Sequence, residues 1–431
     1  MSILLPVKSF EADILRLALK LLMKKERVFT RYQVFMIAIL AFIQFTVILD
    51  FMVLSPLGAI LIPEMSITTA QFGWVVSGYA FSAGISGILA AGFADKFDRK
   101  KLLLFFYVGF LIGTGLCASA NTYPMLLAAR IFTGIFGGVI GSIGFAIITD
   151  IFELNVRGRV MGFTQMAFAA SQILGLPIGL YLANNYGWHS SFWMIVIVGI
   201  LVGIVMVWKI RPINTHLEAN KGQNPIKHLF STISNPDYIK VFLATTLLAT
   251  GGFMLMPFGS TYGINNLGIT LEELPLLYGI TGVFTIVFGP ILGKMSDSYG
   301  RLKVFIFGTV LGIILVGVYT NLGMTPFWVI LVLNIILFLG INARMISSSS
   351  LITAIPDLKD RGAFMSINSS VSQISGGIAS AIAGLIVVQR TDGFVENYPL
   401  LGGVVIASMI ASGALMFGIN KLAEKRTKEQ S

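Results

Sequence analysis

The chain has 431 residues, of which 55% are hydrophobic and only 12% are charged. Soluble domains keep about a quarter of their residues charged, so this composition excludes an ordinary soluble protein and indicates one embedded in a membrane. The formal net charge of +10 would favour nucleic acid as the partner of a soluble chain, but here anionic lipid headgroups are the expected partner and no nucleic acid is expected.

Residues 1–31 form a basic segment in which the apolar side chains from Ile14 to Leu22 fall on one helical face. Such a segment is expected to rest on anionic lipid as an interfacial helix, and docking to a protein partner is the alternative. The segment shows no A-x-A-like cleavage site after an apolar core, so a cleavable signal sequence is not expected.

Twelve apolar runs follow, and each is long enough to cross a hydrocarbon core of about 30 Å as a helix. They cover residues 33–61, 71–94, 101–120, 123–150, 158–184, 190–209, 238–263, 272–295, 302–320, 325–353, 362–388 and 399–419. Strands of a membrane β-barrel would span only about ten residues each. The sequence therefore predicts an all-α membrane protein with twelve transmembrane helices.

All but three of the 30 Lys and Arg residues fall in the two termini or in loops that follow an even-numbered run. The exceptions are Arg130 and Arg344, inside runs, and Arg390, in a loop on the other side. The side with most Lys and Arg is normally cytoplasmic. We therefore expect a multi-pass protein of the cell (inner) membrane with both termini in the cytoplasm.

The two halves of the chain resemble each other. The segment GFADKFDRKK, with Asp95 and Arg99, follows the second run, and GKMSDSYGRLK, with Asp297 and Arg301, follows the eighth. A second matching pair, NVRGRVMG and KDRGAFMS, is displaced by nearly the same distance, about 200 residues. We interpret the chain as a duplicated six-span unit, an architecture of transporters that bind substrate where the repeats meet.

The duplication divides the chain into five parts. These are a cytoplasmic N-terminal segment (1–31), a first six-helix bundle (32–210), a cytoplasmic linker (211–236), a second six-helix bundle (237–420) and a cytoplasmic tail (421–431).

The twelve runs, the repeat and the two loops together resemble the major facilitator superfamily. The loop pattern of that family is G-x-x-x-D-R/K-x-G-R-R/K. The second copy matches it at Gly293, Asp297, Gly300 and Arg301. In the first copy, Ala91 and Asp98 replace the two glycines.

The resemblance implies that these loops act as a latch that closes and opens with the conformation of the transporter. The residues expected to form it are Asp95, Arg99, Lys100, Asp150, Asp297 and Arg301. Asp150 ends the fourth span and is a nearby partner for the loop cations. The alternative is that the basic residues only set the orientation of the chain in the membrane.

Asp50 is a carboxylate inside the first apolar run, where an ionised group is costly unless it has a partner. Arg130, on the fourth run, is the cation of the first half at a similar depth, and RIFTGIFGG resembles a fourth-span pattern linked to proton movement in exporters of the family. Burial favours the neutral acid and the arginine favours the carboxylate, so we expect Asp50 to bind and release protons. A static ion pair that only orients two helices is the alternative.

Arg344 lies in the tenth run without a membrane acid in its own half. We consider three partners for it: Asp50 across the cavity, an anionic group on the substrate, or lipid headgroups.

Polar side chains on several runs are candidates for the wall of a substrate cavity. They are Tyr79 and Ser82 on the second run, Gln165 and Gln172 on the fifth, Ser347 on the tenth, and Asn368 and Ser372 on the eleventh. Each could instead join helices by hydrogen bonds.

The fifth run contains Gly175, Pro177 and Gly179, followed by G-W-x-x-x-F. It resembles the drug and sugar efflux branch of the family, which includes proteins similar to arabinose efflux permeases. We therefore predict an exporter of small organic molecules that works by alternating access in exchange for protons. The alternatives are uptake or exchange of an organic anion, transport of a lysolipid, and a membrane sensor that transports nothing.

The sequence does not favour an enzyme. It contains no G-x-x-x-x-G-K-[ST] motif for a nucleotide, its three histidines lie apart in loops, and its single cysteine, Cys117, stands in an apolar run. We expect no metal and no cofactor other than the proton gradient, and we expect a monomer.

Overall fold

The structure, a computed structural model, describes residues 29–91, 96–214, 231–357 and 360–430. The described residues contain twelve helical segments long and apolar enough to cross a membrane, which confirms the predicted all-α membrane fold. The expected N-terminal interfacial segment lies outside the described residues.

The first six spans comprise α2 to α8. Their bounds are α2 Arg31–Glu64, α3 Thr69–Ala91, α4 Arg99–Ala118, α5 Tyr123–Ile151, α6 Leu154–Ala170 with η2 Ser171–Gly175 and α7 Leu176–Tyr186, and α8 His189–Lys209. The second six comprise α11 Pro236–Leu255 with η3 Met256–Phe258 and α12 Gly259–Asn265, α13 Glu273–Tyr299, α14 Arg301–Tyr319, α15 Phe327–Ile352, α16 Arg361–Ile386 and α17 Tyr398–Gln430. A short antiparallel hairpin, β1 Val388–Gln389 and β2 Val395–Glu396, joins α16 to α17.

Two spans are interrupted, and the reason lies in proline. In the fifth span, the wide turn η2 ends two residues before Pro177, which has no N–H to donate to the preceding turn of helix. In the seventh span, the tighter turn η3 contains Pro257. Each interruption therefore lies where a proline breaks the backbone hydrogen-bond pattern.

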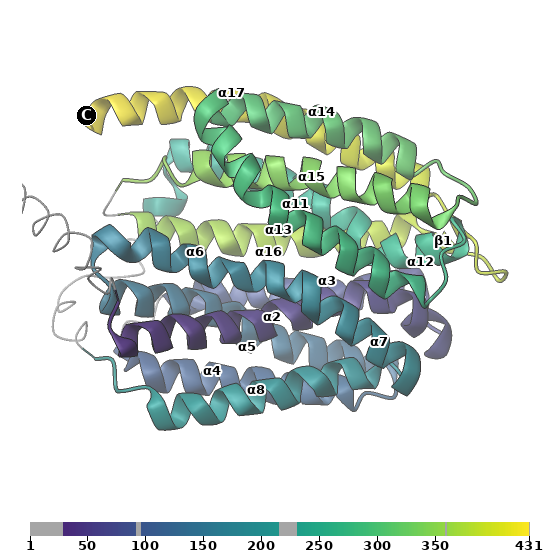
Figure 1. The fold of residues 1–431 in the computed structure, drawn as a ribbon, viewed down its shortest axis with the longest axis horizontal. Coiled ribbons are helices and arrows are strands. Elements are labelled where there is room, and N and C mark those ends of the chain that lie inside the picture. Colours follow the sequence, from purple (N-terminus) through teal and green to yellow (C-terminus); the bar gives the residue numbers. More distant parts are fainter. Residues whose placement is uncertain (1–28, 92–95, 215–230, 358–359, 431) are drawn as a thin grey trace, which may run out of the picture.

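The helices gather into two halves that lie side by side. Figure 1 shows α2 to α8, in purple to teal, in the lower part of the view, and α11 to α17, in green to yellow, in the upper part. Contacts between the halves run through α3 against α16, through α2 against η3 and α12, and through η2 and α7 against α13.

The two ends of the molecule differ. We call the end that carries the 96–98 loop and the end of α17 the basic end, and it lies at the left of Figure 1. The opposite end carries the hairpin. The hydrogen bonds found between the halves in the described ranges lie toward the opposite end. They join Thr69 to Val387, Ser77 to Gly377, Asn184 to Leu271, and Ser260 to Ser55.

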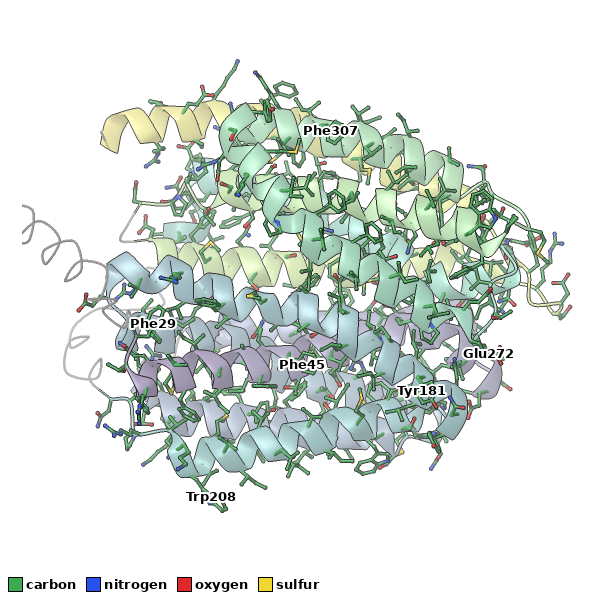
Figure 2. The ribbon with its side chains drawn as sticks, in the orientation of Figure 1. Phe29, Phe45, Tyr181, Trp208, Glu272 and Phe307 are labelled. Atoms are coloured by element: carbon green, nitrogen blue, oxygen red, sulfur yellow. The ribbon has the colours of Figure 1, made fainter. Side chains whose placement is uncertain are left out.

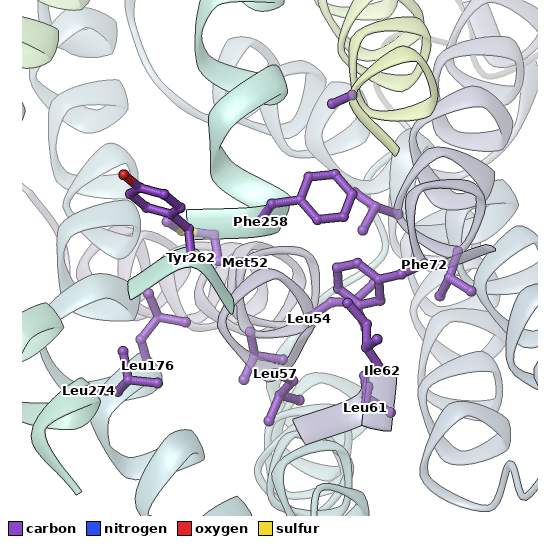
Figure 3. Packing of buried hydrophobic residues seen from close by; sticks show 14 of the residues in the cluster. Met52, Leu54, Leu57, Leu61, Ile62, Phe72, Leu176, Phe258, Tyr262 and Leu274 are labelled. Atoms are coloured by element: carbon purple, nitrogen blue, oxygen red, sulfur yellow. The ribbon is translucent and has the colours of Figure 1, made fainter. Parts of the chain in front are cut away.

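The core continues across the boundary between the halves. Figure 3 shows Leu54, Leu57 and Leu61 of α2 close to Phe72 of α3 and Phe258 of η3, and the two phenylalanine rings meet edge to face with centroids 6.0 Å apart. Large apolar side chains also cover the outside, as Figure 2 shows for Tyr181, Trp208 and Phe307, and Trp208 is 79% exposed. An exposed apolar surface of this kind fits contact with lipid.

Candidate functional site

The centre of the first half holds an ion pair that is entirely removed from the surface. Arg130 Nη1 of α5 donates to Asp50 Oδ2 of α2 at 2.7 Å, and both side chains are 0% exposed. The structure thus brings together the two residues that the sequence proposed as the proton-coupling pair. Because a buried charge is costly when it is left alone, each of the two residues depends on the other.

The pair has further partners, which the sequence did not identify. Thr114 of α4 donates to the other carboxylate oxygen, Asp50 Oδ1, at 3.1 Å. The guanidinium of Arg130 lies 4.5 Å from the centre of the Tyr79 ring on α3, a distance at which the ring attracts a cation. Nε and Nη2 of Arg130 are buried and have no hydrogen-bond partner within the described residues. Two of the three guanidinium nitrogens therefore lie beside the carboxylate without a hydrogen-bond acceptor in the described residues.

Glycines let α5 approach α3 closely enough to place Arg130 over Tyr79. A Cβ on Gly134 would lie 2.4 Å from the backbone oxygen of Tyr79, and one on Gly138 would lie 2.3 Å from that of Ala83. Backbone atoms cannot move away as a flexible side chain can, so these two positions require glycine.

An aromatic chain of contacts leads from the ion pair to the second half. Phe51, next to Asp50, has its ring centre 5.5 Å from that of Tyr79 and 5.5 Å from that of Phe253 on α11. Phe253 in turn packs against Gly376 of α16, where a Cβ would lie 2.8 Å from its ring. These contacts connect the ion pair to the boundary between the halves.

The structure places Arg344 inside the second half. Its Nη2 donates to Ser412 of α17 at 3.0 Å, and its guanidinium lies 5.5 Å from the centre of the Phe305 ring on α14. Arg344 makes no contact with Asp50 in the described structure, and its Nε is buried without a partner there.

Three residues proposed for the cavity wall have hydrogen-bond partners in the structure. Ser82 donates to the carbonyl oxygens of Gly78 and Tyr79 on its own helix, α3. Two others join helices: Ser347 is hydrogen-bonded to Ser296 of α13, and Asn368 accepts from Thr245 of α11.

Two further candidates for the cavity wall are Ser372 and Gln165. Ser372 is half-buried on α16. The side chain of Gln165 lies outside the described residues.

Gln172 differs from the other polar candidates, because it lies in a small cavity between the halves. The cavity, of about 10 Å³, is lined by Gln172 and Leu176 from the first half and by Tyr278, Thr281, Gly282 and Phe338 from the second. The Oε1 atom of Gln172 is buried and accepts no hydrogen bond within the described residues. The Thr281 hydroxyl accepts from Asn334 Nδ2 at 3.0 Å, and in the described part of the chain no hydrogen bond joins it to Gln172 Oε1. The cavity thus offers an acceptor in need of a donor.

The first basic loop is tied to the end of the fourth span. Arg99 Nε donates to Asp150 Oδ2 at 3.2 Å, and Lys100 donates to the backbone oxygen of Val207 on α8 at 3.0 Å. Asp95 lies outside the described residues. In the second copy, Asp297 is exposed, and Arg301 donates to the backbone oxygen of Ser350 at 3.3 Å.

The two copies of the loop differ most at the residue before the helix. Gly300 has φ of +100°, a conformation that favours glycine, whereas its counterpart Asp98 has φ of −57° and needs none. Asp98 instead accepts from the backbone N–H of Lys101 at 3.0 Å and from that of Ile213, in the linker, at 2.9 Å. The N–H of Arg99 donates back to the Ile213 oxygen at 3.0 Å. The first loop therefore holds the start of the linker, a role that the sequence did not suggest.

We expect Asp98→Gly, which restores the family pattern, to release this part of the linker. The Ile213 amide loses a hydrogen bond to a carboxylate, so its hydrogen exchange should become at least about tenfold faster. Exchange measured by mass spectrometry on the purified protein checks this. Asp98→Asn keeps an oxygen acceptor and is the matched control. Equal exchange in wild type and Asp98→Gly would show that the carboxylate does not hold the linker.

Comparison with known proteins gives a consistent result. The Major Facilitator Superfamily profile matches residues 40–282 and 241–430. The uncharacterized MFS-type transporter YceJ of Bacillus subtilis is 27% identical over 272 residues, 62% of this chain and 68% of that protein. Multidrug resistance protein fnx1 of Schizosaccharomyces pombe is 30% identical over 173 residues, which are 40% of this chain and only 31% of that protein.

The fold is also found in solved structures. The crystal structure of a D-xylose-proton symporter superposes with a TM-score of 0.69 at 17% sequence identity, covering 88% of this chain and 97% of that one. At this identity the likeness concerns the fold alone. Together with the profile match over nearly the whole chain, it agrees with the twelve spans described above. The chain is a multi-pass membrane transporter and belongs to the major facilitator superfamily.

Proposed function

We propose that the protein exports small organic molecules in exchange for protons, with Asp50 as the protonation site. The observation that carries this proposal is the fully buried ion pair between Asp50 and Arg130. A carboxylate at this depth that only joined two helices could be replaced by an apolar contact at little cost in stability. Its presence therefore favours a role in moving charge.

The proposed mechanism is alternating access. With Asp50 ionised, Arg130 is held at the carboxylate and over Tyr79. Substrate taken up at the basic end is carried to the opposite end, where the halves part. There a proton from the side of low pH neutralises Asp50 and weakens its hold on the arginine, and substrate leaves. Phe51 and Phe253 connect this change to the boundary between the halves. The protonated protein then closes at the opposite end and reopens at the basic end, where the proton is released, so that protons move inward as substrate moves outward.

Export is supported by the fifth span and by one relative. Gly175, Pro177 and Gly179 surround the break at η2, which faces α13 of the second half. The relative fnx1 is named for multidrug resistance. The protein would lie in the cell (inner) membrane as a monomer, with its basic end in the cytoplasm and in contact with anionic lipid headgroups. The proton gradient would supply the energy, with no other cofactor.

The cavity at Gln172, about 10 Å³, has room for no more than one water molecule, so we propose that a hydroxyl or an amine of the substrate reaches the buried Oε1 of Gln172 only when the halves part there. Uptake or exchange of an organic anion has less support, because Arg344 lies against Ser412 inside the second half. Transport of a lysolipid and a purely sensory role have no specific observation in their favour.

The test uses purified protein in liposomes with an acidic lumen, so that protein whose basic end faces the medium carries substrate into the lumen while protons leave it, and a panel of amines, sugars and organic anions. We expect accumulation of donor-bearing compounds that stops when the gradient is collapsed with an ionophore. Transport of every compound at a rate independent of the gradient would overturn proton coupling.

Gln172→Leu is expected to weaken the apparent affinity for a donor-bearing substrate by about tenfold, because one hydrogen bond to the ligand is lost. The KM for substrate measured in liposomes checks this. The matched control is an analogue of the same substrate with the donor methylated. Gln172→Leu should change the apparent affinity for this analogue little or not at all. An equal loss for both compounds would place Gln172 in packing rather than in substrate contact.

A further inference from the structure

The hydroxyl of Thr114 faces two acceptors but has one proton. Its Oγ1 lies 3.1 Å from Asp50 Oδ1 and 3.0 Å from the backbone oxygen of Phe110, one turn earlier on α4. Thr114 and Asp50 are both 0% exposed. A hydroxyl donates one hydrogen bond and can accept others, so Thr114 can donate to only one of these acceptors at a time.

We infer that Thr114 is a positioning residue that matches Asp50 in both of its protonation states. With Asp50 ionised, the Thr114 hydroxyl donates to Oδ1, and Arg130 donates to Oδ2. When a proton from water binds Oδ1, the new Asp50 O–H donates to Thr114 Oγ1. The Thr114 proton then turns to the oxygen of Phe110. No proton passes from Thr114 to Asp50, so one proton is gained by Asp50 and the rest is rotation of a hydroxyl.

Thr114 is suited to this role because it can both donate and accept a hydrogen bond, which Arg130 cannot. The titratable or charged side chains that act on the Asp50 site are Arg130 on α5, Tyr79 on α3 and Cys117 on α4. Within the described ranges, the side chains that hydrogen-bond Asp50 are Thr114 and Arg130. A guanidinium has five donors and no acceptor, so Arg130 cannot receive a hydrogen bond from a neutral acid. Of these two partners, only Thr114 can serve both states.

The packing of α4 fixes the hydroxyl at this place. A Cβ on Gly113 would lie 2.8 Å from the Cα of Thr133 on α5, so α4 and α5 are in close contact one residue from Thr114. The side chain of Thr133 donates to Ala129 of its own helix and lies 3.7 Å from the sulfur of Cys117. The backbone contact of α4 with α5, rather than a flexible side chain, thus fixes the part of α4 that carries Thr114.

The inference rests on the proposed protonation of Asp50, and its test does not require a substrate. The infrared band of the Asp50 carboxyl group, identified as the one missing in Asp50→Asn, is titrated with pH in purified protein. Thr114→Val keeps the shape and removes the hydroxyl. A hydrogen bond to a carboxylate is stronger than one to a neutral acid, so Thr114→Val removes more stabilisation from the ionised form of Asp50 than from the neutral form. The midpoint should therefore move to higher pH by about one unit, which corresponds to about 1.4 kcal/mol.

Three further variants separate this role from packing. Thr114→Ser keeps the hydroxyl and should keep the wild-type midpoint. Thr309→Val, on α14 of the second half, removes a buried hydroxyl that bonds only its own helix at Phe305 and should also leave the midpoint unchanged. Thr114→Ala replaces Thr114→Val if the latter yields too little folded protein.

The outcomes are distinct. A midpoint of Asp50 that stays in place in both Thr114→Val and Thr114→Ala would overturn the inference and leave the proposed protonation site intact. An Asp50 band that fails to titrate in the wild type would overturn the proposed function and this inference with it.

Discussion

Asp50→Asn is expected to abolish the accumulation of substrate driven by a pH gradient and to preserve exchange of substrate across liposomes at equal pH. The asparagine resembles the protonated acid in size and charge, so Arg130 loses its anion in every state. The cycle can then still turn over with substrate on both sides, but it no longer carries a proton. We expect gradient-driven accumulation to fall to the level of empty liposomes, measured with a labelled substrate.

The matched control for this experiment lies on the same helix. Glu64 ends α2 and is exposed, so Glu64→Gln removes an acidic charge from α2 without touching the buried pair. It should transport like the wild type. Gradient-driven accumulation by Asp50→Asn at the wild-type level would rule out Asp50 as the coupling residue.

Arg130→Leu is expected to destabilise the protein by roughly 3–5 kcal/mol, because it leaves Asp50 buried without a counter-charge. An unfolded Asp binds its proton only below about pH 4. The variant must hold a proton on Asp50 to fold at neutral pH, so the loss of stability should grow as the pH rises. Unfolding followed in detergent at several pH values measures both the size of the effect and its pH dependence.

Two comparisons identify the cause. Arg130→Gln combined with Asp50→Asn removes both charges and should recover most of the lost stability. Arg344→Leu removes a buried guanidinium from the second half and leaves behind the Ser412 hydroxyl rather than a carboxylate, so its loss should be smaller and independent of pH. A loss in Arg130→Leu that is the same at acidic and alkaline pH would show that an unpaired Asp50 is not responsible.

The hydrophobic pattern was sufficient to predict the twelve spans, because a membrane-spanning helix needs about 20 consecutive, predominantly apolar residues. It could not predict where a span is interrupted. Pro56 lies inside the continuous helix α2, whereas Pro177 follows the wide turn η2. The same residue type gives both outcomes, so proline alone does not mark an interruption in the sequence.

The part of the site that holds charged residues was predictable from the sequence, because a buried charge without a counter-charge is costly. Asp50 and Arg130 were paired from their depth, and they are in contact. Thr114 was not predicted, since a buried threonine that bonds the preceding turn, as Thr309 does, looks the same in sequence. The sequence also could not show which partner the Arg344 side chain contacts, because the face that a helix turns toward its neighbours depends on how the bundle packs.

The hydrogen bonds that close the opposite end share one asymmetry. Each has a side-chain donor, on Thr69, Ser77, Asn184 or Ser260, and a main-chain carbonyl as acceptor. A carbonyl is present whatever the side chain, so the acceptor positions can change identity without losing the bond, whereas the donor positions cannot. Where the acceptor residue is also exposed, substitutions should therefore be one-sided, and Leu271, 41% exposed, should be freer to vary than Asn184. The hydrogen bonds at the opposite end would then persist when acceptor residues are substituted, without matching substitutions at the donor residues.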